Sequence, residues 1–219
     1  MRQAFRGSLV HCLADPGENS DPSAVELFED GLLLIDDGVV VASGPANTLL
    51  PQLGDGVELT EFGDNIIVPG FIDCHVHFPQ LDIIASYGEQ LLDWLERYAY
   101  PAEIRFADEA YANEVAGVFL DELLRNGTTT ALVFGTVHAH SADAIFAAAQ
   151  ARGMRLIAGK VLMDINCPEA LRDDPASAYE DSKILIERWH GRGRLGYAIT
   201  PRFALTSSEE QLAAAGRVG

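Results

Sequence analysis

From Phe71 onward, apolar strand-like runs alternate with amphipathic helical segments, and this alternation limits the fold more than any other feature. Strands are expected at 71–77, 128–134, 155–163 and 195–200, and helices at 83–98, 107–125, 141–152, 178–190 and from 207. Apolar strands joined through helices form parallel sheets by right-handed crossovers, with the helices packed outside. The sequence therefore predicts an α/β fold whose four β/α units make half of an eight-stranded (β/α)8 TIM-like barrel.

Local signals mark the ends of these expected helices. Pro101 is expected to interrupt the helix that begins near residue 83. Asn126-Gly127 should end the next helix, since these residues adopt the left-handed conformation common just past a helix. Ser207 followed by Glu210 resembles a capping box and predicts that one more helix begins there.

The first 68 residues carry short β segments and no cluster of titratable side chains. Asp37-Gly38 stands between two apolar runs, a strong signal for a β-hairpin. We expect residues 1–68 to form a small β-sandwich subdomain. Residues 69–219 would then form the first half of the barrel, truncated in its fourth helix.

Composition excludes several classes of function. The 219 residues carry a formal charge of −18, from 15 basic and 33 acidic side chains, so nucleic acid and anionic membrane surfaces are not expected partners. The three cysteines form no Cys-x-x-Cys pair and are odd in number, which favours a reducing compartment. No signal-peptide core or membrane-length apolar run is present, so a cytoplasmic protein is expected.

The segment 69–80, with the sequence PGFIDCHVHFPQ, contains the strongest chemical signal. Side chains alternate across a strand, so His75 and His77 at the end of the first strand lie on the same side. Two imidazoles with that spacing can bind one divalent cation such as Zn²⁺, although two ligands leave its coordination incomplete. Taken alone, a His-x-His pair is more often two polar residues on a half-exposed strand than a metal site.

In an α/β barrel the reacting groups follow the carboxyl ends of the strands. Arg202 follows the fourth strand after a proline and offers planar donors for carbonyl or ring-nitrogen acceptors, and Phe203 could supply a flat apolar wall. A surface ion pair for Arg202 and a core position for Phe203 are the alternatives. Gln80 could contact the edge of a heterocycle. Polar residues at the other strand ends are Thr136, His138, His140, Asp164 and Asn166.

His138-Ala-His140 repeats the His-x-His spacing, but it follows a glycine and precedes a helix. Strand alternation is therefore not assured there, and a solvated loop or a helix start is the favoured interpretation.

Five segments together resemble the guanine deaminase family of the amidohydrolase superfamily. They are PGFIDCHVHFPQ (69–80), LLDWLERYAYPAE (91–103), FGTVH (134–138), GKVLMDINCPE (159–169) and TPRFALTSSEEQL (200–212). The resemblance implies that His75 and His77 are zinc ligands, and that His77, Phe78, Pro79 and Gln80 line the purine site. Arg202 and Phe203 would hold and stack the purine.

The reaction that the resemblance implies is zinc-dependent hydrolysis of guanine to xanthine and ammonia by a complete enzyme, usually a homodimer. The remaining metal ligands and the general acid are expected after Gly219, so no catalytic acid is assigned here and this chain alone is predicted to be inactive. Two alternatives stay open. One is an aminohydrolase of the same superfamily that acts on cytosine or a triazine, and the other is a non-catalytic half-barrel that serves as a binding module.

Overall fold

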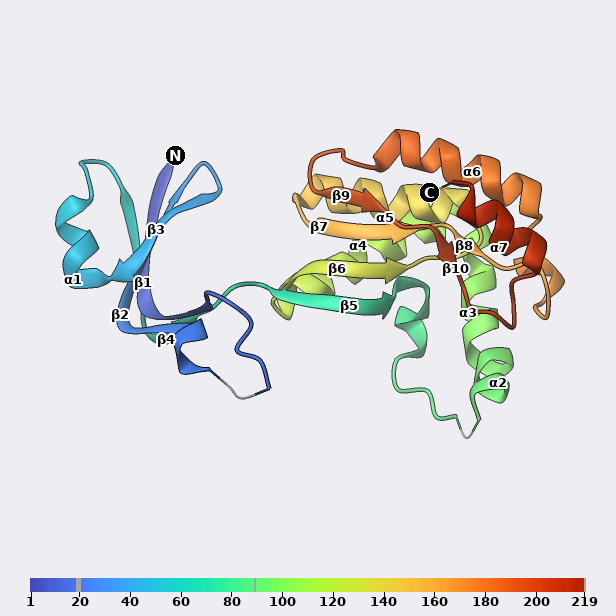
Figure 1. Ribbon diagram of the computed structural model, residues 1–219, viewed down its shortest axis with the longest axis horizontal. Helices are drawn as coiled ribbons and strands as arrows, with labels where there is room; N and C mark the ends of the chain where they lie inside the picture. Colours follow the sequence, from blue (N-terminus) through green and yellow to red (C-terminus); the bar gives the residue numbers. More distant parts are fainter. Residues whose placement is uncertain (19–20, 89, 219) are drawn as a thin grey trace. The chain divides into compact units, whose positions relative to one another are not determined.

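The computed structural model describes residues 1–18, 21–88 and 90–218. The chain divides into two compact units, Met1–Pro69 and Gly70–Gly219 (Figure 1). Each unit has its own sheet and its own buried apolar core.

The N-terminal unit contains one four-stranded sheet with the strand order β3-β2-β1-β4. Its strands are β1 (Arg2–Cys12), β2 (Val25–Asp36), β3 (Val39–Pro45) and β4 (Glu58–Ile67), and the short helix α1 covers Ala46–Leu49. β1 and β4 are parallel, while β1–β2 and β2–β3 are antiparallel. A small core of Ala4, Leu32 and Ala46 lies beneath α1 and the residues that follow it.

The expected hairpin is confirmed. Asp37 and Gly38 have φ angles of 48° and 79°, as a type I′ turn requires, and the turn places Asp36 opposite Val39. The expected sandwich is not found in the described residues, which form a single sheet in this unit. β1 and β2 pair along their whole lengths, with one register shift between Gly7 and Leu9, and all four strands belong to one layer.

The C-terminal unit is built on a parallel sheet with the strand order β5-β6-β7-β9. These strands are β5 (Phe71–His77), β6 (Thr128–Phe134), β7 (Arg155–Gly159) and β9 (Leu195–Tyr197). The short strands β8 (Val161–Leu162) and β10 (Thr200–Pro201) pair in parallel beyond the ends of β7 and β9. The predicted α/β architecture with a parallel sheet is therefore confirmed.

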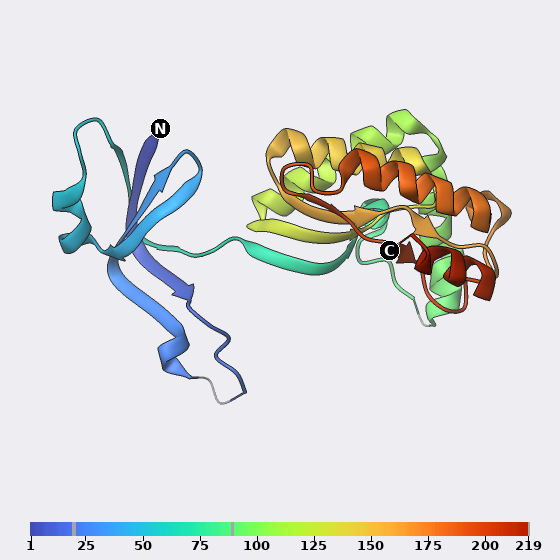
Figure 2. The ribbon, with the colours of Figure 1, turned by 45° about the horizontal axis from the view of Figure 1, so that its top comes forward.

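Three long helices pack on this sheet and on one another (Figure 2). They are α4 (Glu109–Arg125), α5 (Ala139–Arg152) and α6 (Pro175–Trp189), and α7 (Glu209–Gly216) follows β10. Alternate residues of β6, such as Ala131 and Val133, are buried against them. Within the described residues, no helix combines the length and the apolar character needed to cross a bilayer.

Between β5 and α4 the sequence predicts a helix over 83–98, but the chain first forms a 3-10 turn and becomes continuously helical only from Leu91. A 3-10 turn covers Phe78–Ile83, α2 covers Leu91–Trp94, a π-helical turn covers Leu95–Ala99 and α3 covers Tyr100–Ile104. α2, the π-helical turn and α3 follow one another without a break, so the chain is helical from Leu91 to Ile104 and the predicted interruption at Pro101 is wrong. The π-helical turn stands directly before the residues around Pro101, where the missing N–H prevents the regular helical hydrogen bond. α3 carries Glu103.

The last helix begins one residue later than predicted. Ser208, and not Ser207, is the N-cap of α7, and its hydroxyl accepts from the backbone N–H of Gln211 at 3.1 Å. The Ser207 hydroxyl does not cap the helix, because it donates to the carbonyl of Leu162. The predicted capping box of Ser207 with Glu210 is therefore wrong.

Candidate active site

His75 and His77 converge at the end of β5. Their Nε2 atoms lie 3.2 Å apart and their ring centroids 5.1 Å apart, so the rings are not splayed. Two zinc–nitrogen bonds of about 2.0–2.1 Å at a tetrahedral angle place their nitrogens about 3.3 Å apart. The observed separation therefore suits two ligands of one cation, and it also suits a hydrogen bond between the rings.

Phe134, the last residue of β6, supports both imidazoles. Its ring is stacked on His77, with 4.7 Å between centroids, and lies 5.0 Å from His75. β5 and β6 pair so that His77 is opposite Phe134, which explains the contact. The aromatic ring limits the directions in which the two imidazoles can point.

The surroundings of His77 keep its ring neutral. Burial, followed by the positive charge of Arg202 and the neighbouring His75, lowers the pKa of His77 to about 4. A neutral imidazole has a free lone pair, the form that binds a metal.

The donor set is only part of a metal site. In the described ranges, no group of three or more His, Cys, Asp or Glu side chains is arranged to hold a metal ion. His75 and His77 could therefore supply two ligands, and further groups must complete the coordination of zinc.

Phe78 and Pro79 are buried and do not offer side chains to a ligand. Phe78 packs edge-on against Phe106, with 5.1 Å between centroids, and contacts Phe119 in the main core. Only the backbone at these two positions can take part in the predicted purine site.

Gln80 and Arg202 are joined by a buried carboxylate that sequence reasoning did not single out. Gln80 Nε2 donates to Glu103 Oε1 at 3.1 Å, and the Arg202 guanidinium donates to Glu103 Oε2. The side chains of Arg202 and Glu103 are 5% and 1% exposed. The surface ion pair considered for Arg202 is therefore wrong, because this pair is buried. Glu103 lies on α3 and joins Gln80, which follows β5, to Arg202, which follows β10.

Arg202 is also fixed from two other directions. Its backbone N–H donates to the carbonyl of Leu162 at 3.0 Å, and its guanidinium carbon lies 5.4 Å from the centre of the Tyr100 ring. Burial raises the pKa of the Tyr100 hydroxyl, so this ring stays neutral beside the cation.

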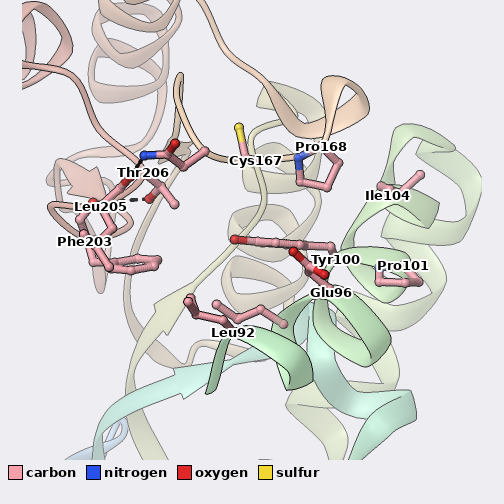
Figure 3. Close-up of a pocket in the computed structure, with 12 residues that line it drawn as sticks. Leu92, Glu96, Tyr100, Pro101, Ile104, Cys167, Pro168, Phe203, Leu205 and Thr206 are labelled. Carbon is pink, nitrogen blue, oxygen red and sulfur yellow. Dashed lines mark hydrogen bonds between the residues drawn. The ribbon is translucent and has the colours of Figure 1, made fainter. Parts of the chain in front are cut away.

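Two cavities flank the apolar cluster around Tyr100. The smaller, about 380 Å³, is lined by His75, His77 and Gln80. The larger, about 870 Å³, lies between Phe203 and Leu205 on one side and Tyr100, Pro101 and Ile104 on the other (Figure 3). Phe134 and Phe203 both pack on the cluster between them. We place the candidate site at the smaller cavity, because the histidines lie there, with Phe203 on the far side of the cluster.

Two of the other strand-end candidates serve the starts of helices. Asp164 Oδ1 accepts from the N–H of Ser208 at 2.7 Å, and the buried Thr136 hydroxyl lies 2.7 Å from that of Ser141 on α5. Asn166 has a φ of 50° and donates to the carbonyl of Leu205 at 2.6 Å beside the larger cavity.

The second histidine pair lies at the start of α5, as the sequence favoured. His138 is the N-cap residue, and His140 Nε2 donates to the carbonyl of Phe106 at 2.7 Å. The two rings are stacked with centroids 5.5 Å apart. The Nε2 atom of His140 is therefore bound to a backbone carbonyl and does not face a shared cation position with His138.

Comparison with known proteins agrees with this geometry. The model of the amidohydrolase family matches residues 66–218. Guanine deaminase from Escherichia coli is 50% identical over 219 residues, and its solved structure superposes with a TM-score of 0.95. A probable guanine deaminase from Deinococcus radiodurans is 43% identical over 94% of this chain and 47% of its own length. The crystal structure of guanine deaminase from C. acetobutylicum with bound guanine is 28% identical over all of this chain and 50% of its own, with a TM-score of 0.86.

The chain spans about half the length of these relatives: the match to the E. coli sequence covers 99% of this chain but 49% of that protein. The family model nevertheless covers the whole parallel sheet and both strand ends that carry His75, His77 and Arg202. This chain belongs to the amidohydrolase family.

Proposed function

We propose that the whole protein hydrolyses guanine to xanthine and ammonia, and that this chain supplies two of its zinc ligands and part of its purine site. The observation that carries the proposal is the convergence of the His75 and His77 Nε2 atoms, 3.2 Å apart, within the electrostatic reach of a buried Arg202. The 50% identity to the E. coli guanine deaminase supports guanine as the substrate.

His75 and His77 would hold the metal through their Nε2 atoms. A zinc ion bound there supplies Lewis acidity that brings the pKa of water toward neutrality, so hydroxide is available at physiological pH. The lowered pKa of His77 keeps its ligand nitrogen unprotonated at neutral pH.

Arg202 and Gln80 would position the substrate. A guanidinium is always charged and offers planar donors to carbonyl and ring-nitrogen acceptors. Phe203 follows Arg202 in the chain but lines the larger cavity and not the one that contains the histidines, so its ring is not part of the purine site proposed here. The bound guanine of the C. acetobutylicum relative supports a purine ligand.

The proton donor is expected in the part of the relatives that this chain does not match. Ring nitrogen and departing amine both need a proton, which a positioned carboxylic acid commonly supplies. The two carboxylates nearest the histidine pair in the described residues are already engaged: Glu103 is held by Arg202 and Gln80, and Asp73 accepts from the backbone N–H of His75. We therefore expect the 219-residue chain alone to be inactive.

The open edges of both sheets indicate how the whole protein completes its fold. We infer that β5-β6-β7-β9 is the first half of a (β/α)8 barrel, and that a later segment completes the N-terminal sheet as a sandwich. Exposed apolar residues support both inferences: Ile72 on β5 is 68% exposed and Ile66 on β4 is 64% exposed. A homodimer is the expected assembly, which sedimentation of the whole protein would test.

The decisive experiment is a substrate panel with the purified whole protein and metal analysis of the same sample. We expect ammonia release from guanine, about one zinc per active site, and no activity from the 219-residue chain. Activity on cytosine or a triazine without activity on guanine would overturn the substrate assignment. A whole protein that retains no zinc and no activity would support the non-catalytic binding module.

A further inference from the structure

We propose that Glu103 is a positioning residue that sets the hydrogen-bond polarity of the purine site, so that the site selects a 6-oxopurine over a 6-aminopurine. This inference rests on the proposed function and deepens it. The observation behind it is that one buried carboxylate binds Gln80 through one oxygen and Arg202 through the other.

The carboxylate determines which end of the Gln80 amide faces it. An ionised carboxylate only accepts hydrogen bonds, so the Gln80 group within 3.1 Å of Glu103 Oε1 must be the NH₂ group. The amide carbonyl is then on the other branch of the side chain. Gln80 lines the cavity that contains both histidines, so it can offer this acceptor to a ligand there.

Arg202 has the opposite character. A guanidinium has five N–H donors and no acceptor, and the bond to Glu103 uses one edge of it. The remaining donors stay available. Glu103, only 1% exposed, therefore holds a donor group, Arg202, through one oxygen and fixes the orientation of the Gln80 amide through the other.

This order of donor and acceptor matches one class of purine. Guanine has an acceptor, the 6-oxo group, beside a donor, the N1–H. In 2,6-diaminopurine the same edge is reversed, with a 6-amino donor beside an unprotonated N1. Both molecules carry the 2-amino group that hydrolysis removes, so they differ at the edge that Arg202 and Gln80 would contact.

Glu103→Gln in the whole protein tests the proposal. A glutamine at this position can donate or accept, so the Gln80 amide is free to turn over and the polarity is no longer enforced. We expect kcat/KM for guanine to fall about 10- to 100-fold, the effect of losing a hydrogen bond to a charged group. The value for 2,6-diaminopurine should change less than about threefold, so the selectivity ratio falls at least about tenfold.

The ratio of the kcat/KM values for the two substrates, measured on one sample, does not depend on how much of the protein is folded. A purely structural role for Glu103 would therefore lower both values together and leave the ratio unchanged, and that result would overturn the proposal. If 2,6-diaminopurine turns over too slowly, the inhibition constants of hypoxanthine and adenine give the same comparison.

Asp82→Asn is the matched control. Asp82 accepts from Arg105 and Tyr111, so it is also a carboxylate paired with an arginine between the 3-10 turn and the segment after α3, but it is exposed. Its removal should leave the selectivity ratio unchanged.

If Glu103→Gln does not fold, Gln80→Met removes the acceptor itself and should lower the selectivity ratio about tenfold. An unchanged ratio would again overturn the proposal. A wild-type protein with no guanine deaminase activity would overturn the proposed function as well, whereas an active wild type with unaltered selectivity in the variants overturns only the role of Glu103.

Discussion

The chain contains two His-x-His sequences whose structures differ. His75 and His77 end a strand, and their Nε2 atoms meet at 3.2 Å. His138 and His140 begin a helix, and their rings lie stacked with centroids 5.5 Å apart. Both residues of the first pair line one cavity. In the second pair, His140 Nε2 donates to the Phe106 carbonyl, while His138 is the N-cap residue of α5 without a side-chain capping hydrogen bond.

The difference shows that the supporting elements, and not the spacing, determine what two histidines can do. Strand alternation places residues i and i+2 on one side. At the start of α5 the two rings are nearly as close, with centroids 5.5 Å apart against 5.1 Å in the first pair, but the Nε2 atom of His140 already donates to the Phe106 carbonyl. The first pair is also held by Phe134 from the neighbouring strand. A two-residue spacing therefore indicates a metal site only at the end of a strand with such support.

The largest expected effect comes from replacing one histidine of each pair in the whole protein. His77→Ala should lower zinc content and reduce guanine deaminase activity by more than about 100-fold, since even loss of groups that only orient ligands costs 10- to 100-fold. His138→Ala should keep zinc and stay within about threefold of wild type, because the second pair is not a ligand set. Equal losses in both variants, measured by metal analysis and ammonia release, would remove the distinction between the pairs.

Phe134→Ala should weaken the first pair without touching a ligand atom. The stacked ring is lost, the imidazoles gain freedom, and we expect zinc affinity to fall about 10-fold, as for groups that orient ligands. Titration against a competing chelator measures this effect. Phe134→Leu is the control that keeps apolar packing, and an unchanged affinity in both variants would show that the ring does not orient the histidines.

His140→Ala should affect stability and leave metal binding unchanged. It removes the donor to the Phe106 carbonyl, and loss of a hydrogen bond that leaves a buried partner costs about 1–3 kcal/mol. His75→Ala in the metal-free protein is the comparison, with an expected cost of less than about 0.5 kcal/mol because His75 is exposed. Urea unfolding gives both values, and the reverse order would contradict the structural role of the second pair.

The smallest effect should be a dependence on pH. Burial, together with His140 and Lys160, lowers the pKa of His138 below its ordinary value of 6.5. A lowered folded pKa contributes stability that is complete above 6.5 and is lost as the pH falls through the folded pKa. His138→Gln should therefore lose less stability than wild type between pH 7.5 and pH 5, measured by urea unfolding of the metal-free proteins. Identical losses would show that the ring stays as solvated in the folded state as in the unfolded chain.

Sequence reasoning predicted the parts of the fold that depend on local pattern. The β-branched run 128–134 is β6, and Asp37-Gly38 forms the hairpin. It failed where two adjacent residues compete for one role, as Ser207 and Ser208 do at the start of α7. There the choice depends on Leu162 and Asp164, which are far away in sequence.

The two site residues that were missed have the same explanation. Phe134 is one apolar residue in an apolar strand, and nothing local distinguishes it from Val133. Glu103 is one of 33 acidic residues, and its carboxylate is notable only because Gln80 and Arg202 meet it in the folded chain. The glutamate's position at the end of the family-like segment 91–103, two residues after Pro101, was the available signal.

The sequence by itself determined the parallel α/β architecture and the pair of histidines at the end of β5, because the period of apolar residues and strand alternation are local properties. Only the tertiary structure decided that Phe134 stacks on those histidines, that Phe78 belongs to the core, and that Glu103 joins Gln80 to Arg202. Arg202 and Glu103 are 99 residues apart in the chain. Their pairing requires β10 and α3 to be brought together, which depends on how the whole unit packs.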